Sequence, residues 1–306
     1  MQPLRVALVL GSGGLAGTAF HAGLLSALAD RGWDARDADV VVGTSAGSTT
    51  AALLRAGFPP RDLLPRMTGE PMSPDGERIL GGVPPVQGAR RQGRARPSPA
   101  SLRLLATSLL RRPGSVPPGV LLAAALPAGT APTDEISTVY DPLHRTWPER
   151  PLWVNAVRLD TGHRVVFGRD RTDVPVGTAV TASCAVPGLY VPPVVDGVPH
   201  VDGGAWSLCH ADLVADADVD LVVVSAPMST TQRRSRSMRG FARRQLEREL
   251  RHARAPVLVV APDEATRAVL AGTGMDASKR PAIARHVHET VLDCVDDTLL
   301  AALLRT

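Results

Sequence analysis

Aromatic residues are scarce in this sequence: Phe, Trp and Tyr together make up 3% of the 306 residues. Hydrophobic residues still reach 44%, so the core must be built mainly from Val, Leu and Ala, which suit buried parallel strands and close helix packing. The shortage of rings also leaves little to stack on nucleic-acid bases, and no nucleic-acid-binding module is recognisable. We therefore expect no nucleic-acid partner.

Cysteine and lysine are rare as well. The three cysteines, Cys184, Cys209 and Cys294, show no CxxC spacing, so they indicate neither a disulfide framework nor a zinc site. We expect a reducing compartment, no metal and no cofactor. Because Lys279 is the only lysine, Arg carries nearly all the positive charge of a chain whose formal net charge is +4. A basic patch of this kind could attract anionic lipid, nucleic acid or neither.

Long apolar runs are missing too. No stretch reaches the ~20 apolar residues that a bilayer span requires. The first residues form a short strand-like run that passes straight into glycines, unlike a signal peptide. We expect a cytoplasmic protein that is soluble or peripheral at a membrane, and the sequence leaves its oligomeric state open.

Two strand, glycine turn and helix units open the chain. The apolar run 4–10 is closed by glycines at 11–14, and apolar residues recur at helical spacing over 16–31. The run 39–42 then meets a second glycine turn at 43–47, followed by a small-residue helix. Two such units predict a parallel sheet with right-handed crossovers, and so an α/β protein.

The rest of the chain fits one domain, 1–306, with a Pro- and Arg-rich insertion at about 60–150. Beyond the insertion the pattern predicts a β-hairpin over 152–167 and a helix over 174–185. The later elements are a short strand at 198–201, buried strands at 220–225 and 256–261, and an amphipathic helix within 232–254.

The second glycine turn, Gly43-Thr44-Ser45-Ala46-Gly47, is a G-x-S-x-G sequence between a strand and a helix. That is the context of a nucleophile elbow, in which flanking glycines permit a tight turn and the serine hydroxyl projects at a helix N-terminus. The alternative is a plain glycine turn whose serine caps the following helix.

The first glycine turn, from Gly11 through Gly13 and Gly14 to Gly17, presents free backbone N–H groups at the start of a helix. Such groups could bind the pyrophosphate of a dinucleotide, but the glycine spacing does not match that fingerprint. The same N–H groups could stabilise the oxyanion of an acyl-transfer intermediate, which suits a chain that also has an elbow.

A third motif, Asp202-Gly203-Gly204, places a carboxylate at a strand end. Asp-Gly is also a common turn. A serine nucleophile needs a base, however, and the histidines nearest these motifs, His21 and His200 among them, fit structural positions better than catalytic ones.

These motifs together resemble the patatin-like phospholipases: the glycine turn at 11–17, the elbow at Ser45, the run ASCAVPGLYVP at 182–192 and the D-G-G at Asp202 occur in that family's order. The resemblance extends to about Gly204. It implies a three-layer α/β/α fold with a mainly parallel central sheet.

The resemblance also implies a Ser–Asp dyad. Ser45 would attack an ester carbonyl and Asp202 would accept its proton. The N–H groups of Gly13 and Gly14 would hold the oxyanion. Gly11, Gly17, Gly43, Gly47, Gly203 and Gly204 would support these turns.

The glycine turn departs from the family pattern, because Leu15 and Ala16 stand where the family usually has Lys or Arg. The oxyanion site should then rely on backbone groups and the helix dipole. We also expect Asp202 to reach Ser45 across the sheet.

The sequence therefore predicts a lipid acyl hydrolase that acts on phospholipids or other acyl esters. The alternative is a catalytically idle relative that binds lipid or a partner protein. The basic stretch Arg90 to Arg96, with Arg111 and Arg112, could hold lipid headgroups, and the leucines at 102–110 could touch acyl chains. A disordered loop and an ordinary amphipathic helix are the alternatives for these segments.

Overall fold

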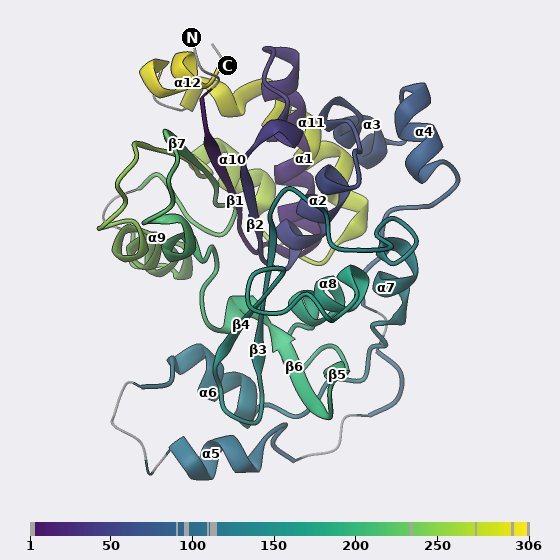
Figure 1. Ribbon diagram of the computed structural model, residues 1–306, viewed down its shortest axis with the longest axis vertical. Coiled ribbons are helices and arrows are strands. Elements are labelled where there is room, and N and C mark those ends of the chain that lie inside the picture. The colour runs from purple at the N-terminus through teal and green to yellow at the C-terminus, as the bar shows by residue number, and fades with distance from the viewer. Residues whose placement is uncertain are drawn as a thin grey trace.

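The computed structural model describes residues 4–89, 91–94, 98–108, 110, 115–232, 235–272, 274–294 and 297–304. Within them, eight strands form one twisted sheet with helices on both faces (Figure 1). The strands are β1 (Val6–Leu10), β2 (Val40–Gly43), β3 (Leu152–Arg158), β4 (Arg164–Phe167), β5 (Val194–Val195), β6 (Val198–Asp202), β7 (Leu221–Ser225) and β8 (Val257–Val260). The helices are α1 (Gly14–Asp30), α2 (Ala46–Arg55), α3 (Leu63–Thr68), α4 (Pro74–Leu80), α5 (Leu102–Ser108), α6 (Pro118–Ala125), α7 (Asp134–Tyr140), α8 (Val176–Cys184), α9 (Met238–Glu249), α10 (Glu264–Leu270), α11 (Arg280–Thr290) and α12 (Asp297–Leu303).

The sheet is mixed but mainly parallel. Its order is β5-β6-β3-β2-β1-β7-β8, with β4 paired to β3. Strands β3, β2, β1, β7 and β8 run parallel, whereas β4 and β6 run antiparallel to β3. The predicted fold class is confirmed, as is the hairpin of β3 and β4. The prediction that the last strand is fully buried is wrong, because β8 pairs with β7 at the edge of this order and leaves Val259 38% exposed.

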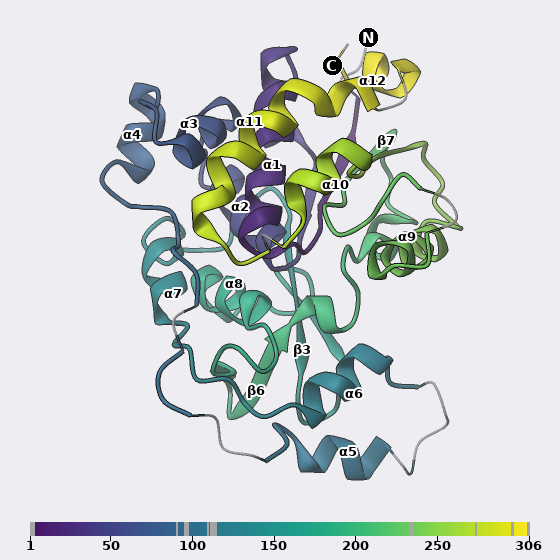
Figure 2. The same cartoon turned by 180° about the vertical axis from the view of Figure 1, so that it is seen from behind.

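Helices cover the two faces unequally. On one face α1, α2, α8 and α11 pack over the larger hydrophobic cluster, and Figure 2 shows α11 lying against α1. A Cβ at Gly23 of α1 would lie 2.5 Å from the carbonyl oxygen of Ala284 in α11, so glycine is what lets these helices touch. On the other face a smaller cluster brings alternate residues such as Val9 and Val42 against Leu246 of α9. This alternation along the strands produces the three layers.

The described parts of 60–150 contribute to the larger hydrophobic cluster and to a separate smaller one. Leu63, Met67 and Tyr140, from α3 and α7, belong to the cluster that contains α1. Helices α5 and α6 instead pack with β3 and β6 in a smaller cluster, at the opposite end of the molecule from α12 (Figures 1 and 2). None of the helices formed by the described residues combines the length and the apolar character that crossing a bilayer requires.

Candidate active site

Ser45 occupies a sharp turn between β2 and α2. Its φ of 53° and ψ of −119° lie where non-glycine residues are rarely found, a strain of about 1–3 kcal/mol that the surrounding structure must support. The flanking glycines are required by close packing: a Cβ on Gly47 would lie 1.9 Å from the carbonyl oxygen of Leu10, and one on Gly43 would lie 2.6 Å from the Cα of Ser48. The turn thus has the geometry of a nucleophile elbow.

Helix α8 fixes the backbone of this elbow. The N–H of Ser45 donates to Oγ of Ser183 at 2.9 Å, and the thiol of Cys184 donates to the carbonyl oxygen of Ser45 at 3.4 Å. Ser48 donates to the same carbonyl oxygen at 2.7 Å. Ser183 is fully buried, as a structural serine should be. Cys184 is only partly buried and lines the cavity described below.

Strand register explains how Asp202 comes near Ser45. Gly43 at the end of β2 pairs with Val154 of β3, and Asp202 at the end of β6 pairs with Ala156, two residues further along β3. Since β4 occupies the other edge of β3 over this stretch, β2 and β6 meet end to end along one edge. Asp202 therefore approaches Ser45 along one edge of β3. The expectation that it would approach across the sheet is wrong.

Asn155 lies between these strand ends. Its Nδ2 donates to the carbonyl oxygen of Gly43 and to Oγ1 of Thr44, both at 3.2 Å. A Cβ on Gly203 would lie 2.5 Å from the carbonyl oxygen of Asn155 and 3.0 Å from a methyl carbon of Thr44. The first glycine after Asp202 is thus required for the two turns to approach.

Asp202 is 5% exposed. Burial raises its pKa to about 6, although hydrogen bonds from the Ser45 side chain and from the Gly204 N–H act to lower that pKa. The Gly204 N–H donates to Oδ1 at 2.7 Å. A carboxylate with a pKa near neutrality is a stronger base than an ordinary aspartate and is still ionised at pH 7.

The first glycine turn lies at the N-terminus of α1. Backbone hydrogen bonds within the described residues use the N–H groups of Ser12 and Gly17 but leave those of Gly13 and Gly14 without a protein acceptor. A Cβ on Gly13 would lie 2.5 Å from the Cα of Gly17, and Gly14 has a φ of 59°, so both positions favour glycine. Ala46, the first residue of α2, also keeps a free N–H among the described residues, a donor that the sequence motifs did not indicate.

The histidines near these turns bind backbone rather than Ser45. His21 contacts the carbonyl oxygen of Gly11 at 2.8 Å, and burial lowers its pKa to about 4. His200 contacts the carbonyl oxygen of Val198 at 2.8 Å. Both are structural, as the sequence indicated.

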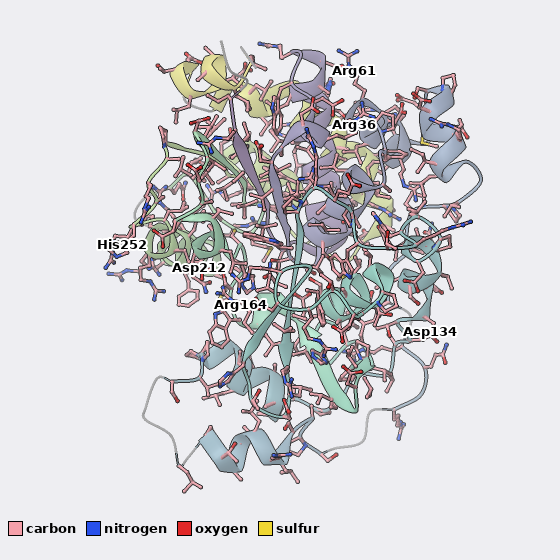
Figure 3. The ribbon with its side chains drawn as sticks, in the orientation of Figure 1. Arg36, Arg61, Asp134, Arg164, Asp212 and His252 are labelled. Carbon is pink, nitrogen blue, oxygen red and sulfur yellow. The ribbon has the colours of Figure 1, made fainter. Side chains whose placement is uncertain are left out.

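His210, in the segment after Asp202, makes contacts on both ring nitrogens. Its Nε2 lies 3.0 Å from the carbonyl oxygen of Gly203, and its Nδ1 lies 3.1 Å from Nη1 of Arg164. Since Arg164 can only donate, Nδ1 accepts and Nε2 donates, which is the neutral imidazole. Burial, followed by the Arg164 charge, lowers the pKa of His210. Arg164 is held in turn by Asp212 at 2.8 Å (Figure 3).

Ser45 opens onto a cavity that is partly open to solvent. The walls are mostly apolar and come from α1, α2, α3, α7 and the segment after α8. Among the described residues that line it, Arg66 and Arg280 carry charge. The mostly apolar lining suits an acyl chain or a similar apolar group.

The basic segment and the leucine patch do not line this cavity within the described residues. Arg90, Arg96, Arg111 and Arg112 lie outside the described residues, as does the side chain of Cys294. Arg91 is described and donates to the carbonyl oxygen of Gly188 at 3.3 Å. Leu102 is 66% exposed on α5, so it contacts neither the cavity nor the main core.

The matches to known proteins agree with this architecture. A family model described as patatin-like phospholipase matches residues 8–209, two thirds of the chain. The chain belongs to the patatin-like phospholipase family, and the resemblance carried by the four motifs is confirmed.

Several solved structures are also similar. The type III effector protein ExoU is 20% identical, with a TM-score of 0.38, over 99% of this chain and 54% of that chain. VipD from Legionella pneumophila is 15% identical, with a TM-score of 0.44, over 98% of this chain and 67% of that one. The ExoU–SpcU complex of Pseudomonas aeruginosa gives 20% identity and a TM-score of 0.35, over 99% of this chain and 57% of that chain. This chain spans about half the length of the ExoU chains, and the family assignment rests on the family model rather than on these structures.

Proposed function

We propose that this chain is a serine acyl hydrolase that cleaves carboxylic ester bonds of lipids, as a phospholipase A or lipid esterase. The observation that carries the proposal is the pairing of Ser45, strained at an elbow, with a buried Asp202 carboxylate whose pKa is raised to about 6. Family membership supports a lipid substrate, and the mostly apolar cavity beside Ser45 supports an acyl chain.

In the first half of the reaction, Oγ of Ser45 attacks the ester carbonyl carbon while Asp202 accepts the hydroxyl proton. The negative charge that develops on the carbonyl oxygen is stabilised by the free N–H groups of Gly13 and Gly14, at the N-terminus of α1, and of Ala46, at the N-terminus of α2. The tetrahedral intermediate then collapses. The carbon–oxygen bond to the alcohol breaks, and Asp202 returns its proton to the departing oxygen.

The second half repeats these steps with water. Asp202 takes a proton from a water molecule that attacks the acyl-enzyme, and the returning proton restores the Ser45 hydroxyl as the fatty acid leaves. No histidine is needed, because the raised pKa of Asp202 already brings this base toward the working pH.

A fluorophosphonate probe tests the proposal directly. We expect covalent labelling of wild type, with the modified peptide mapped by mass spectrometry to Ser45, and no labelling of Ser45→Ala. Ser137→Ala, at a half-buried position of α7 that does not line the cavity, should label like wild type. If wild type is folded but is not labelled, the alternative of an idle lipid- or partner-binding relative is favoured.

His210 is expected to position Asp202 rather than to react. His210→Asn keeps a residue that tolerates the positive φ of 57° but cannot reach the carbonyl oxygen of Gly203. We expect kcat for a soluble ester to fall about tenfold, from the loss of one buried hydrogen bond, with KM nearly unchanged. The acid limb of the pH profile should also shift as the Asp202 turn loosens.

Asp212→Asn is the control for this prediction, because Asp212 lies at the exposed end of the same hydrogen-bonded chain, beyond Arg164. Its kcat should stay within about twofold of wild type. Equal losses in both variants would mean that the effect is general destabilisation.

A further inference from the structure

Two guanidinium groups line the same cavity as Ser45. Arg66 comes from α3 and Arg280 begins α11, and Arg280 is 6% exposed. Both are held by backbone carbonyl groups: Nη1 of Arg66 donates to Val83 at 2.8 Å, and Nη1 of Arg280 donates to Val86 at 2.9 Å. Each also makes one longer backbone bond. These contacts fix the position of the two side chains but do not neutralise their charge.

Neither charge is balanced by a carboxylate among the described residues. Glu70, which follows α3, is already paired with Arg285 at 2.8 Å. Burial lowers the pKa of Arg66 and of Arg280, and the pKa of Arg66 is lowered further by the charge of Arg280. Placing a buried charge near a half-buried charge of the same sign is unfavourable unless an anion joins them.

Each guanidinium has donors to spare. Of its five N–H bonds, the described structure uses two in each residue, which leaves three on each. Arg66 also lines a surface groove with Pro84 and Pro85, and Pro85 lines the cavity as well, so this charged region lies where the cavity meets the surface. An anion held there would keep its outer side in water.

We propose that Arg66 and Arg280 together bind the phosphate of a glycerophospholipid whose acyl ester lies at Ser45. A phosphate offers several oxygens to two planar donor groups, which a single carboxylate does less well. The apolar part of the cavity then takes the acyl chain. This inference rests on the proposed function and narrows it to substrates that carry phosphate.

The test compares two substrates with the same acyl chain, 1-oleoyl lysophosphatidate and 1-oleoylglycerol, presented in the same neutral detergent micelles. Wild type should prefer the phosphate-bearing substrate in kcat/KM. Arg66→Gln and Arg280→Gln should each lower kcat/KM for lysophosphatidate about 10- to 100-fold, the range for one charged hydrogen-bonding group. The value for 1-oleoylglycerol should change less than about threefold in both.

Arg285→Gln is the matched control, because Arg285 lies on α11 but pairs with Glu70 and does not line the cavity. It should behave like wild type on both substrates. Arg66→Lys and Arg280→Lys keep the charge without the planar fork, and should fall between wild type and the glutamine variants. If circular dichroism shows that a glutamine variant does not fold, the corresponding lysine variant takes its place in the comparison.

Inorganic phosphate separates a lipid headgroup from a free anion. It should inhibit wild-type hydrolysis of 1-oleoyl lysophosphatidate competitively, and do so more weakly in the arginine variants. Inhibition by phosphate without any preference for lysophosphatidate would overturn the proposal, as would equal losses on both lipids. Absence of turnover on these lipids and on a p-nitrophenyl ester would instead overturn the proposed function, whereas turnover with no arginine effect would overturn this inference alone.

Discussion

Replacing Ser45 with alanine is expected to lower kcat for a short-chain p-nitrophenyl ester by about 10⁴-fold or more. The variant keeps the backbone of the elbow, since the hydrogen bonds from its N–H to Ser183 and to its carbonyl oxygen from Ser48 do not involve the lost hydroxyl. It loses only the atom that would form the acyl-enzyme. Release of p-nitrophenolate, followed by absorbance, measures the effect, and thermal unfolding checks that the fold is intact.

Ser183→Ala separates reaction from positioning. The Ser183 hydroxyl supports the elbow by accepting the Ser45 N–H, and Ser183 does not line the cavity. We expect a loss of about tenfold, the effect of one buried hydrogen bond. If Ser45→Ala keeps more activity than Ser183→Ala, the hydrolysis arises from another group and the elbow has no chemical role.

Much of this site was predictable because its signals are local. A strand, a glycine turn and a helix succeed each other within a few residues, and glycine at 43 and 47 is required by contacts inside that same unit or with β1 beside it. The spacing around Ser45 therefore predicts the elbow that is observed. The glycine turn at 11–17 is predictable for the same reason.

The path of Asp202 was not predictable in this way. Its approach depends on β6 running antiparallel to β3 and ending against β2, a register set by pairing between segments more than 40 residues apart. Nothing in the D-G-G sequence specifies that partner. The contact of His210 with the Asp202 turn was not predictable for the same reason, because the partner of His210, Arg164, belongs to the distant strand β4.

Arg66 and Arg280 were not predicted as binding residues, because in a sequence only longer runs of charge indicate a charged site. The stretch from 90 to 96 is rich in arginine, which is typical of solvated segments. Arg66 is instead a single charge among Leu64, Pro65 and Met67, and it meets Arg280 only through the packing of α3 on α11. An isolated arginine in an apolar segment was the one local signal available.

Asp202→Asn is expected to abolish activity while making the protein more stable at neutral and alkaline pH. The amide cannot accept the Ser45 proton, so kcat should fall by about 10⁴-fold. Its oxygen can still accept the Gly204 N–H that now donates to Oδ1 at 2.7 Å. The activity of wild type should itself rise with pH through an apparent pKa near 6, because only ionised Asp202 is a base.

The stability gain follows from the sign of the same pKa shift. Burial raises the pKa of Asp202 from 3.8 to about 6, so the folded state holds its proton more tightly than the unfolded state does. As pH rises from about 4 to about 6, wild type therefore loses stability, in total on the order of 2–3 kcal/mol. Asparagine carries no charge and avoids this loss, so its advantage in thermal unfolding should appear at pH 8 and nearly vanish at pH 4.

Asp160→Asn should give the opposite sign. The hydrogen bond from Arg158 lowers the pKa of Asp160 to about 2, so its ionised form stabilises the fold above the unfolded pKa, and removing the charge should lower stability at pH 8. Asp160 follows the end of β3, beyond Val154 and Ala156, which pair with Gly43 and Asp202, and its variant should keep its esterase activity. An Asp202→Asn protein that is less stable than wild type at pH 8 would mean that Asp202 is a structural carboxylate whose charge the fold needs. The burial of Asp202 would then not explain how this carboxylate could act as a base without a histidine.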